Sequence, residues 1–133
     1  MSTIPASHAD LLSWEKPTFA HLATINADGS PQVTPVWFEF DGTHIVVNTA
    51  TGRVKDKNLS RASSVALSVL DPANAYRYIQ VQGRVAERTL EGADACIDRL
   101  ALKYLGQEKY PFGRPGEVRV TFKIEPVRAQ VMG

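Results

Sequence analysis

The residues best suited to bind a ligand lie together in residues 48–61, N-T-A-T-G-R-V-K-D-K-N-L-S-R. The apolar residues 45–47 predict a strand, residues 49–52 predict a turn, and the residues from Arg53 onward predict a short basic helix. The start of a helix offers free backbone N–H groups and the positive end of the helix dipole. Such a junction is suited to bind a phosphate group.

The side chains of this segment add donors and positive charge. Thr49 and Thr51 carry hydroxyl groups, and the cations are Arg53, Lys55 and Lys57. An Arg and a Lys two residues apart can bracket one phosphate, because Arg offers a planar pair of donors and Lys a mobile charge. The alternative is a basic helix that covers one end of a barrel and faces water, as charge runs usually do. The segment alone leaves both interpretations open.

The composition describes a single globular domain over residues 1–133, with 44% hydrophobic and 22% charged residues. The net charge is only +1, so a general nucleic-acid-binding role has no electrostatic support. A single cysteine, Cys96, excludes an internal disulfide and fits a reducing compartment. Because the chain shows no signal peptide and no run long enough to span a bilayer, we expect a cytoplasmic protein without a membrane partner.

Alternation and turn residues predict a mainly β domain. Strands are expected over residues 18–25, 32–40, 43–49, 65–70, 76–87, 118–125 and 127–132. Helices are expected over residues 7–14, from Arg53 onward, and from Thr89 as N-cap to Gly106. These strands, mostly joined by hairpins, are more than one small open sheet can bury. We therefore expect a closed or split barrel with helices packed on it.

Two residues disturb the regular strands. Pro35 cannot donate to a ladder, so it predicts a sheet edge or bulge where backbone groups could face a ligand. Gly83 predicts a bend in the strand over residues 76–87. Trp37 is either a ligand contact or part of the core, since large aromatic residues serve in both roles.

The residues that most often bind metals or act as nucleophiles do not form a recognisable site. The histidines His8, His21 and His44 lack metal-ligand spacing, so no metal is expected. Cys96 falls on the apolar face of its helix and is expected to be a packed thiol. No G-x-S-x-G elbow is present, so serine-based nucleophilic catalysis is not indicated.

In this order of elements the chain resembles the pyridoxamine 5′-phosphate oxidase-like split-barrel flavoproteins, and within them the short branch that uses the deazaflavin coenzyme F420. Four motifs carry the resemblance, in the family's order: L-A-T-I-N-A-D-G-S-P-Q-V-T-P-V-W (22–37), G-R-V-K-D-K-N-L (52–59), S-V-A-L-S-V (64–69) and Y-I-Q-V-Q-G-R-V (78–85). The resemblance implies an FMN-binding split barrel, mainly β with flanking helices and six to seven antiparallel strands.

The resemblance also implies where the cofactor binds. The basic pair of the R-x-K-x-x-N-L pattern would hold the cofactor phosphate, the preceding turn would add donors, and the P-V-W strand would lie along the ring. A homodimer is implied, with two tyrosines offered by the second subunit. The implied cofactor-binding residues are Gln32, Thr34, Pro35, Val36, Trp37, Asn48, Thr49, Ala50, Thr51, Arg53, Lys55, Asn58, Tyr76 and Tyr78.

The function implied is an F420-dependent oxidoreductase that transfers hydride between the deazaflavin and an organic acceptor, with the cofactor carrying the chemistry. No catalytic acid is identified, and Tyr76 and Tyr78 are the candidates for a proton donor. One alternative is an FMN-binding flavin oxidoreductase on the same fold. Another is a non-catalytic carrier or sensor that binds a phosphorylated cofactor or haem without turnover.

Overall fold

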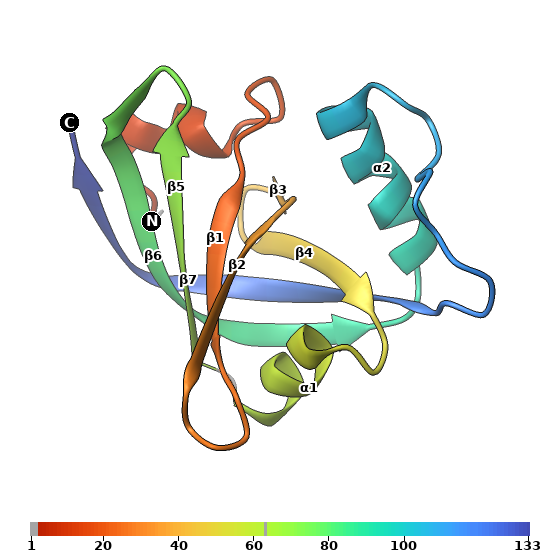
Figure 1. Ribbon diagram of the computed structural model, residues 1–133. Coiled ribbons are helices and arrows are strands. Elements are labelled where there is room, and N and C mark those ends of the chain that lie inside the picture. The colour runs from red at the N-terminus through yellow and green to blue at the C-terminus, as the bar shows by residue number, and fades with distance from the viewer. Residues whose placement is uncertain (1–2, 63) are drawn as a thin grey trace.

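The computed structural model describes residues 3–62 and 64–133, and in them seven strands form one antiparallel sheet in the order β2-β1-β5-β6-β7-β4-β3 (Figure 1). The strands are β1 (Ala20–Ile25), β2 (Pro31–Val36), β3 (Glu39–Phe40), β4 (Ile45–Ala50), β5 (Ser64–Asp71), β6 (Asn74–Thr89) and β7 (Arg119–Met132). The helices are η1 (Ala6–Leu12), α1 (Val54–Arg61) and α2 (Ala93–Leu105). No helix in the described part of the chain combines the length and apolar character needed to cross a bilayer.

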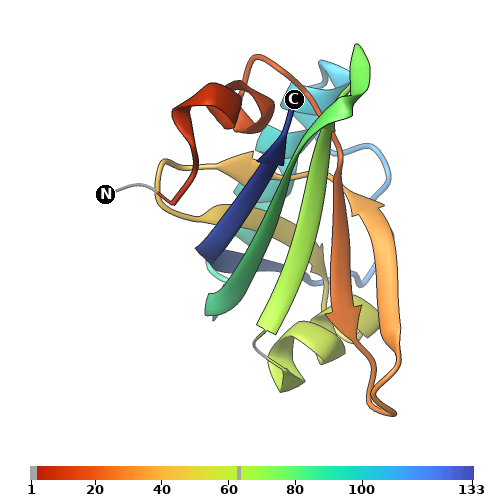
Figure 2. The ribbon, with the colours of Figure 1, turned by 90° about the vertical axis from the view of Figure 1, so that its left-hand side faces the viewer.

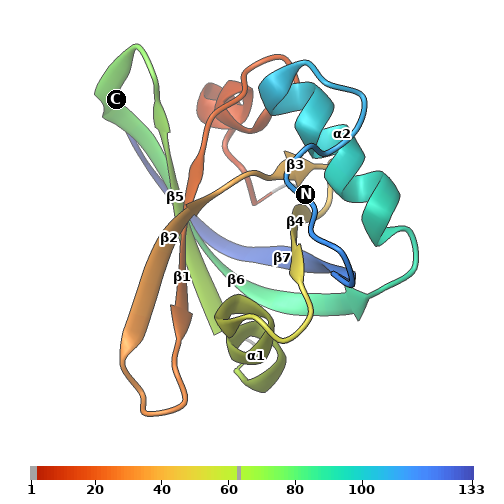
Figure 3. The same cartoon turned by 45° about the vertical axis from the view of Figure 1, so that its right-hand side comes forward.

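The sheet curls because its two longest strands, β6 and β7, bend. Figure 2 shows one half of the sheet with β7, β6, β5, β1 and β2 side by side, and Figure 3 shows β4 and β7 turning away from that half. The pairing register of β6 shifts between Gln82 and Gly83, so the predicted bend is confirmed. A Cβ at Gly83 would lie 2.7 Å from Ile124 Cγ2 and 2.9 Å from the Glu125 carbonyl oxygen, so the bend has room only for glycine.

The alternating strands point their apolar side chains into the curl. Val120, Phe122 and Ile124 of β7 are completely buried there, together with Ile79 and Val81 of β6. Each such side chain contributes about 1.5–3 kcal/mol to folding when it is removed from water. The residues predicted as two final strands form the single strand β7. Its Pro126 lies opposite Gly83, at the irregularity, where a missing N–H group is tolerated.

The single strand predicted over residues 32–40 is wrong, because the chain crosses from one edge of the sheet to the other within it. Pro35 lies in the edge strand β2, as predicted, whereas β3 forms the opposite edge. At the crossing, the Tyr104 hydroxyl of α2 donates to the Thr18 carbonyl at 2.5 Å and accepts from the Phe38 N–H at 3.2 Å. Burial raises the pKa of Tyr104 to about 12, so the hydroxyl stays protonated and keeps this bond.

The predicted start of the long helix at Thr89 is also wrong. Strand β6 continues through Thr89, whose hydroxyl accepts the Glu91 N–H at 3.1 Å. Helix α2 begins after Gly92, which adopts φ +75°. Its predicted end is confirmed, since Gly106 is the C-cap in the left-handed conformation. The two glycines set where α2 lies over β4 and β7.

Replacing Tyr104 by Phe tests whether its hydroxyl fixes the crossing. The Tyr104→Phe protein keeps the ring but leaves the Thr18 carbonyl and the Phe38 N–H without this partner. The free energy of unfolding should therefore fall by about 1–3 kcal/mol in urea titrations. The matched control is Tyr76→Phe, because Tyr76 is 85% exposed, and it should unfold like the unmodified protein. Equal stability of the two variants would contradict the assigned role.

Candidate functional site

A cavity of about 250 Å³ opens where β2, β4, α1 and α2 meet. Half of the residues implied by the sequence line it: Pro35, Val36, Trp37, Asn48, Thr49, Arg53 and Lys55. They come from the end of β2, from β4 and from the start of α1. The fold thus brings the phosphate-binding segment and the P-V-W strand to one place, although they lie at opposite ends of the β2 to α1 segment.

Four other implied residues lie near lining residues in the sequence but do not line the cavity themselves. Thr34, in β2, has a buried hydroxyl oxygen without a hydrogen-bond partner among the described residues. Gln32 lies in the same strand, and its side-chain oxygen accepts a hydrogen bond from Thr24 Oγ1 at 3.5 Å. Ala50 ends β4, and the Thr51 N–H donates to the Val118 carbonyl at 2.8 Å. Thr34 pairs with the core residue Leu22 and does not line the cavity, so its role as a cofactor-binding residue stays a prediction.

Three implied residues lie elsewhere in the chain. Asn58 is buried between α1 and β1, where its amide donates to Thr24 Oγ1 at 3.0 Å and Asn26 Oδ1 at 2.9 Å. These bonds hold α1 against the β1–β2 hairpin. Tyr76 and Tyr78 lie in β6, outside the cavity of this chain. Their role as residues offered to a second subunit stays a prediction.

The end of the cavity predicted to bind phosphate has unpaired positive charge. Lys55 is half-buried, and its ammonium has no hydrogen bond or ion pair among the described residues. Burial, together with the charge of Arg53, lowers the pKa of Lys55. Arg53 is 51% exposed and pairs with Glu117 at 3.3 Å. The first N–H groups of α1 are likewise free of backbone acceptors, as expected at a helix start. An anion would relieve this local excess of charge.

Asp56 fixes the start of α1 that presents these groups. Its carboxylate accepts the Gly52 N–H at 2.9 Å and the Arg88 Nε at 3.0 Å. Burial opposes ionisation of Asp56, but these hydrogen bonds outweigh it and hold the pKa of the carboxyl below its usual range. Asp56 does not line the cavity, and its carboxylate binds Arg88 of β6 and the Gly52 N–H.

Arg119 is a site residue that the sequence interpretation missed. It begins β7, is buried, and lines the cavity. Its Nε donates to Asn48 Oδ1 at 2.8 Å and its Nη1 to Glu117 Oε1 at 2.5 Å. The hydrogen bond from Arg119 lowers the pKa of Glu117. The Glu117 carboxylate also pairs with Arg53, so the two arginines share it. Strand alternation assigned Arg119 to a polar outer face, but α2 and the segment before β7 cover that face.

Aromatic rings form a further part of the cavity wall, where Arg119 lies over the Tyr110 ring at 5.1 Å. Trp37 stacks on Tyr104 with ring centroids 5.2 Å apart and planes 4° apart. Tyr110 meets Trp37 edge-on at 6.0 Å, and Phe112 meets Tyr110 edge-on at 5.7 Å. Trp37 therefore packs on α2 and also lines the cavity, and its role as a ligand contact stays a prediction. A planar ring system fits such a wall.

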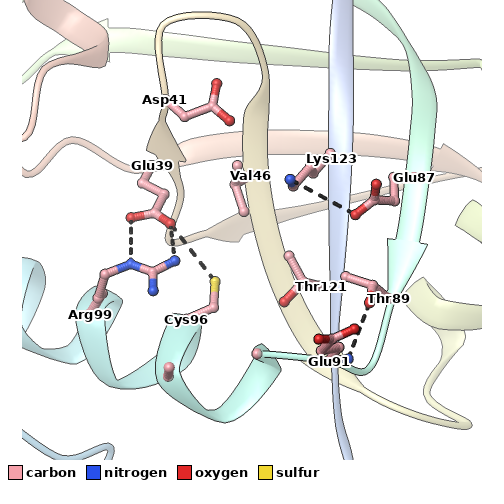
Figure 4. Close-up of a pocket in the computed structure, with 12 residues that line it drawn as sticks. Glu39, Asp41, Val46, Glu87, Thr89, Glu91, Cys96, Arg99, Thr121 and Lys123 are labelled. Carbon is pink, nitrogen blue, oxygen red and sulfur yellow. Dashed lines mark hydrogen bonds and ion pairs between the residues drawn. The ribbon is translucent and has the colours of Figure 1, made fainter.

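A second, larger cavity of about 460 Å³ lies between α2, β4 and β6 (Figure 4). There Arg99 donates to Glu39 at 2.7 Å, and Lys123 pairs with Glu87 at 3.8 Å. The Cys96 thiol is buried beside Glu39, and burial raises its pKa, so the prediction of a packed thiol is confirmed. None of the implied cofactor-binding residues lines this cavity. The first cavity is therefore the candidate site.

Comparisons with known proteins agree with this fold. Residues 5–133 match the family described as pyridoxamine 5′-phosphate oxidase. An F420H(2)-dependent biliverdin reductase from Mycobacterium tuberculosis is 36% identical over 110 residues, which cover 81% of this chain and 76% of that protein. A solved F420 reductase superposes with a TM-score of 0.83 at 32% identity, covering 96% of this chain and 98% of that one.

A more distant structure shows the fold alone. A conserved hypothetical protein from Mycobacterium tuberculosis superposes with a TM-score of 0.72 at 23% identity, covering 99% of this chain and 88% of that one. The predicted mainly β split barrel is confirmed by these superpositions and by the curled seven-stranded sheet.

The ion pair that holds α1 gives a prediction about acid stability. The pKa of Asp56 is depressed in the folded state. Its contribution to the free energy of unfolding is therefore complete above the unfolded pKa of about 3.9, and it is lost as the pH falls through the folded pKa. Asp56→Asn should lower the free energy of unfolding at pH 7 by about 1.5–3 kcal/mol. It should also flatten the dependence of stability on pH below pH 4, measured by urea titration at each pH. A variant with the unmodified protein's pH slope would show that this carboxylate carries no such energy.

Proposed function

The chain belongs to the pyridoxamine 5′-phosphate oxidase family, and from this premise we propose that it is a cytosolic reductase dependent on coenzyme F420. Two relatives above 30% identity support the choice of F420 within the family, since both are named for that coenzyme. The single cysteine, buried and unpaired with another, supports a reducing compartment. The proposal concerns reduction of an organic acceptor by hydride.

The observation that carries the proposal is the unpaired charge at the start of α1. Lys55 is half-buried in the cavity lining without a counter-charge among the described residues. Among the described residues, the cavity lining holds three cations, Arg53, Lys55 and Arg119, and no carboxylate. Partial burial of a cation is costly unless an anion neutralises it. A phosphate on the ligand supplies that anion.

The residues of the cavity fit a phosphorylated, planar cofactor. Reduced F420, when bound there, would supply a hydride to the acceptor. Lys55, Arg53 and the N–H groups at the start of α1 would bind its phosphate. Trp37 would lie against the ring and exclude water. Lys57, exposed on α1 without an ion pair among the described residues, would be a candidate to bind an anionic tail of the cofactor.

We further propose that the protein is a homodimer with a cofactor at each subunit interface. The outer face of the sheet half in Figure 2 carries few charges across its centre, where Val33, Ala23, Ala66 and Gln82 lie in one row. A groove of about 540 Å³ runs along this face. Tyr76, near the start of β6, is 85% exposed. A partner covering this face would explain such exposed apolar and aromatic residues.

The first experiment is a fluorescence titration of the purified protein with F420 and, in parallel, with FMN. We expect tight binding of F420 and much weaker binding of FMN. Lys55→Ala should weaken F420 binding about 10–100-fold, because it removes one charge-assisted bond to the phosphate. The control is Lys109→Ala, since Lys109 is 86% exposed and outside the cavity.

The outcomes of this titration separate the alternatives. Preference for FMN would move the protein to the flavin-dependent members of the family. Tight F420 binding with no reduction of quinones, tetrapyrroles or unsaturated lactones would favour a non-catalytic carrier. Equal F420 affinity in the Lys55 and Lys109 variants would reject the assignment of the phosphate site.

The dimer has its own measurement, the molar mass by light scattering. The chain is 14.6 kDa, so a dimer should show twice this mass. Ala66→Arg places a charge at the centre of the sheet face and should give monomers that bind F420 weakly, because Tyr76 and Tyr78 of the partner are then missing. Leu102→Arg, on the exposed side of α2, should remain dimeric. A monomeric wild-type protein with full F420 affinity would refute the interface.

A further inference from the structure

Glu117 is a carboxylate that binds two cations of the candidate site from outside the cavity. Its side chain is only 9% exposed, and it accepts hydrogen bonds from Arg119 Nη1 at 2.5 Å and from Arg53 Nη2 at 3.3 Å. Both arginines line the cavity, whereas Glu117 does not. Within the described residues, no other carboxylate forms an ion pair with a cation of this lining. Glu117 is therefore the negative charge that lies nearest to the proposed phosphate site.

The segment that carries Glu117 is fixed beside the turn before α1. The Val118 carbonyl accepts the Thr51 N–H at 2.8 Å. The next residue, Arg119, pairs with Ala50 in the ladder between β4 and β7. Because backbone bonds hold the residues that follow Glu117, its carboxylate is part of the scaffold of the site.

The other charged groups around Glu117 line a small cavity of about 240 Å³ next to the candidate site. They are Asp94 and Asp98 of α2, Arg114 and Arg119. No histidine of the described chain lines this small cavity or the candidate site. The hydrogen bond from Arg119 lowers the pKa of Glu117, so its carboxylate stays charged down to mildly acidic pH.

A fixed carboxylate at this place acts on the charge of a bound phosphate. A phosphate that is esterified once carries a charge of about −1.5 to −2 at neutral pH, because its second pKa is about 6. A phosphate that is esterified twice has no second proton to lose and carries a single charge. Since the Coulomb energy is proportional to each charge, a carboxylate repels the first kind of phosphate about twice as strongly as the second.

We propose that Glu117 makes the anion site selective for a phosphodiester and against a terminal phosphate group. This rests on the proposed function, because F420 continues beyond its phosphate into an anionic tail, whereas FMN ends at its phosphate. The two cofactors therefore present different charges to the same arginines. Glu117 acts through its charge, without lining the cavity, and weakens the binding of FMN more than the binding of F420.

The test compares FMN with its phosphate methyl ester, two ligands that share one ring and differ in the charge of the phosphate. Flavin fluorescence measures both dissociation constants at pH 7.5. In Glu117→Gln, the affinity for FMN relative to the ester should rise about tenfold, the effect of one charge across a guanidinium group in a partly screened site. Weaker positioning of the arginines would change both affinities by the same factor, and an unchanged ratio would overturn the inference.

The same ligands at pH 5 give a second readout. FMN then carries a single phosphate charge, as the ester does, while Glu117 remains ionised because its pKa is held below the usual range. The effect of Glu117→Gln on the affinity ratio should therefore disappear at pH 5. A tenfold change that persists at pH 5 would contradict selectivity based on charge.

Two further variants complete the experiment. Glu87→Gln makes the same substitution at a 52% exposed glutamate outside the cavity and should leave the ratio unchanged. If circular dichroism shows that Glu117→Gln does not fold, Arg114→Gln replaces it, since Arg114 is exposed and has no ion pair in the described part of the chain. Removing this positive charge should lower the ratio about two- to threefold, and no shift would overturn the inference.

The failure of this inference differs from the failure of the proposed function. If the wild-type protein binds F420 tightly but Glu117→Gln changes the affinities for FMN and the ester equally, the selectivity is rejected and the proposed function stands. If the wild-type protein binds both flavins but not F420, the proposed function fails, yet the ratio of the two flavins still tests Glu117. Binding of none of the three ligands would reject both.

Discussion

The short crossing between β2 and β3 is the constraint on which the fold depends. These strands are the two edges of the seven-stranded sheet, and six strand spacings of a flat sheet would hold them about 29 Å apart. The chain from Val36 to Glu39 can reach at most about 11 Å. The sheet must therefore curl until its edges come together. Gly83 and Pro126 allow the long strands to bend, and the Tyr104 hydroxyl holds the crossing closed.

Closure of the sheet also assembles the site. The crossing carries Trp37 to the end of β4, where the chain enters α1 and presents Arg53 and Lys55. Ala50 of β4 pairs with Arg119 of β7, so the missed arginine lies beside the same helix start. Helix α2 then contributes Ile97 and Leu100 to the lining. No residue of the site is far from an element that the closure fixes, which gives the cavity a stable shape before any ligand binds.

The parts predicted from the sequence were those set by local chemistry. Val120, Phe122 and Ile124 alternate, so their strand and buried face were predictable, and the glycine after Thr51 marked the entrance to α1. The break at Trp37 was not predictable, because apolar alternation continues through it and only long-range pairing separates β2 from β3. The burial of Arg119 was not predictable either. It depends on the packing of α2 against β7, and the sequence of β7 alone does not reveal that packing.

Electrostatics links two arginines of the candidate site, Arg53 and Arg119, through one carboxylate. Glu117 is only 9% exposed and is the carboxylate shared by Arg53 and Arg119, so in the free protein it holds both side chains in place. A phosphate that binds Arg53 competes with Glu117 for that guanidinium. The carboxylate would then pair with Arg119 alone, through its bond to Nη1. Binding at the start of α1 would thereby change the ion pairs of both arginines, because the two guanidinium groups share this one carboxylate.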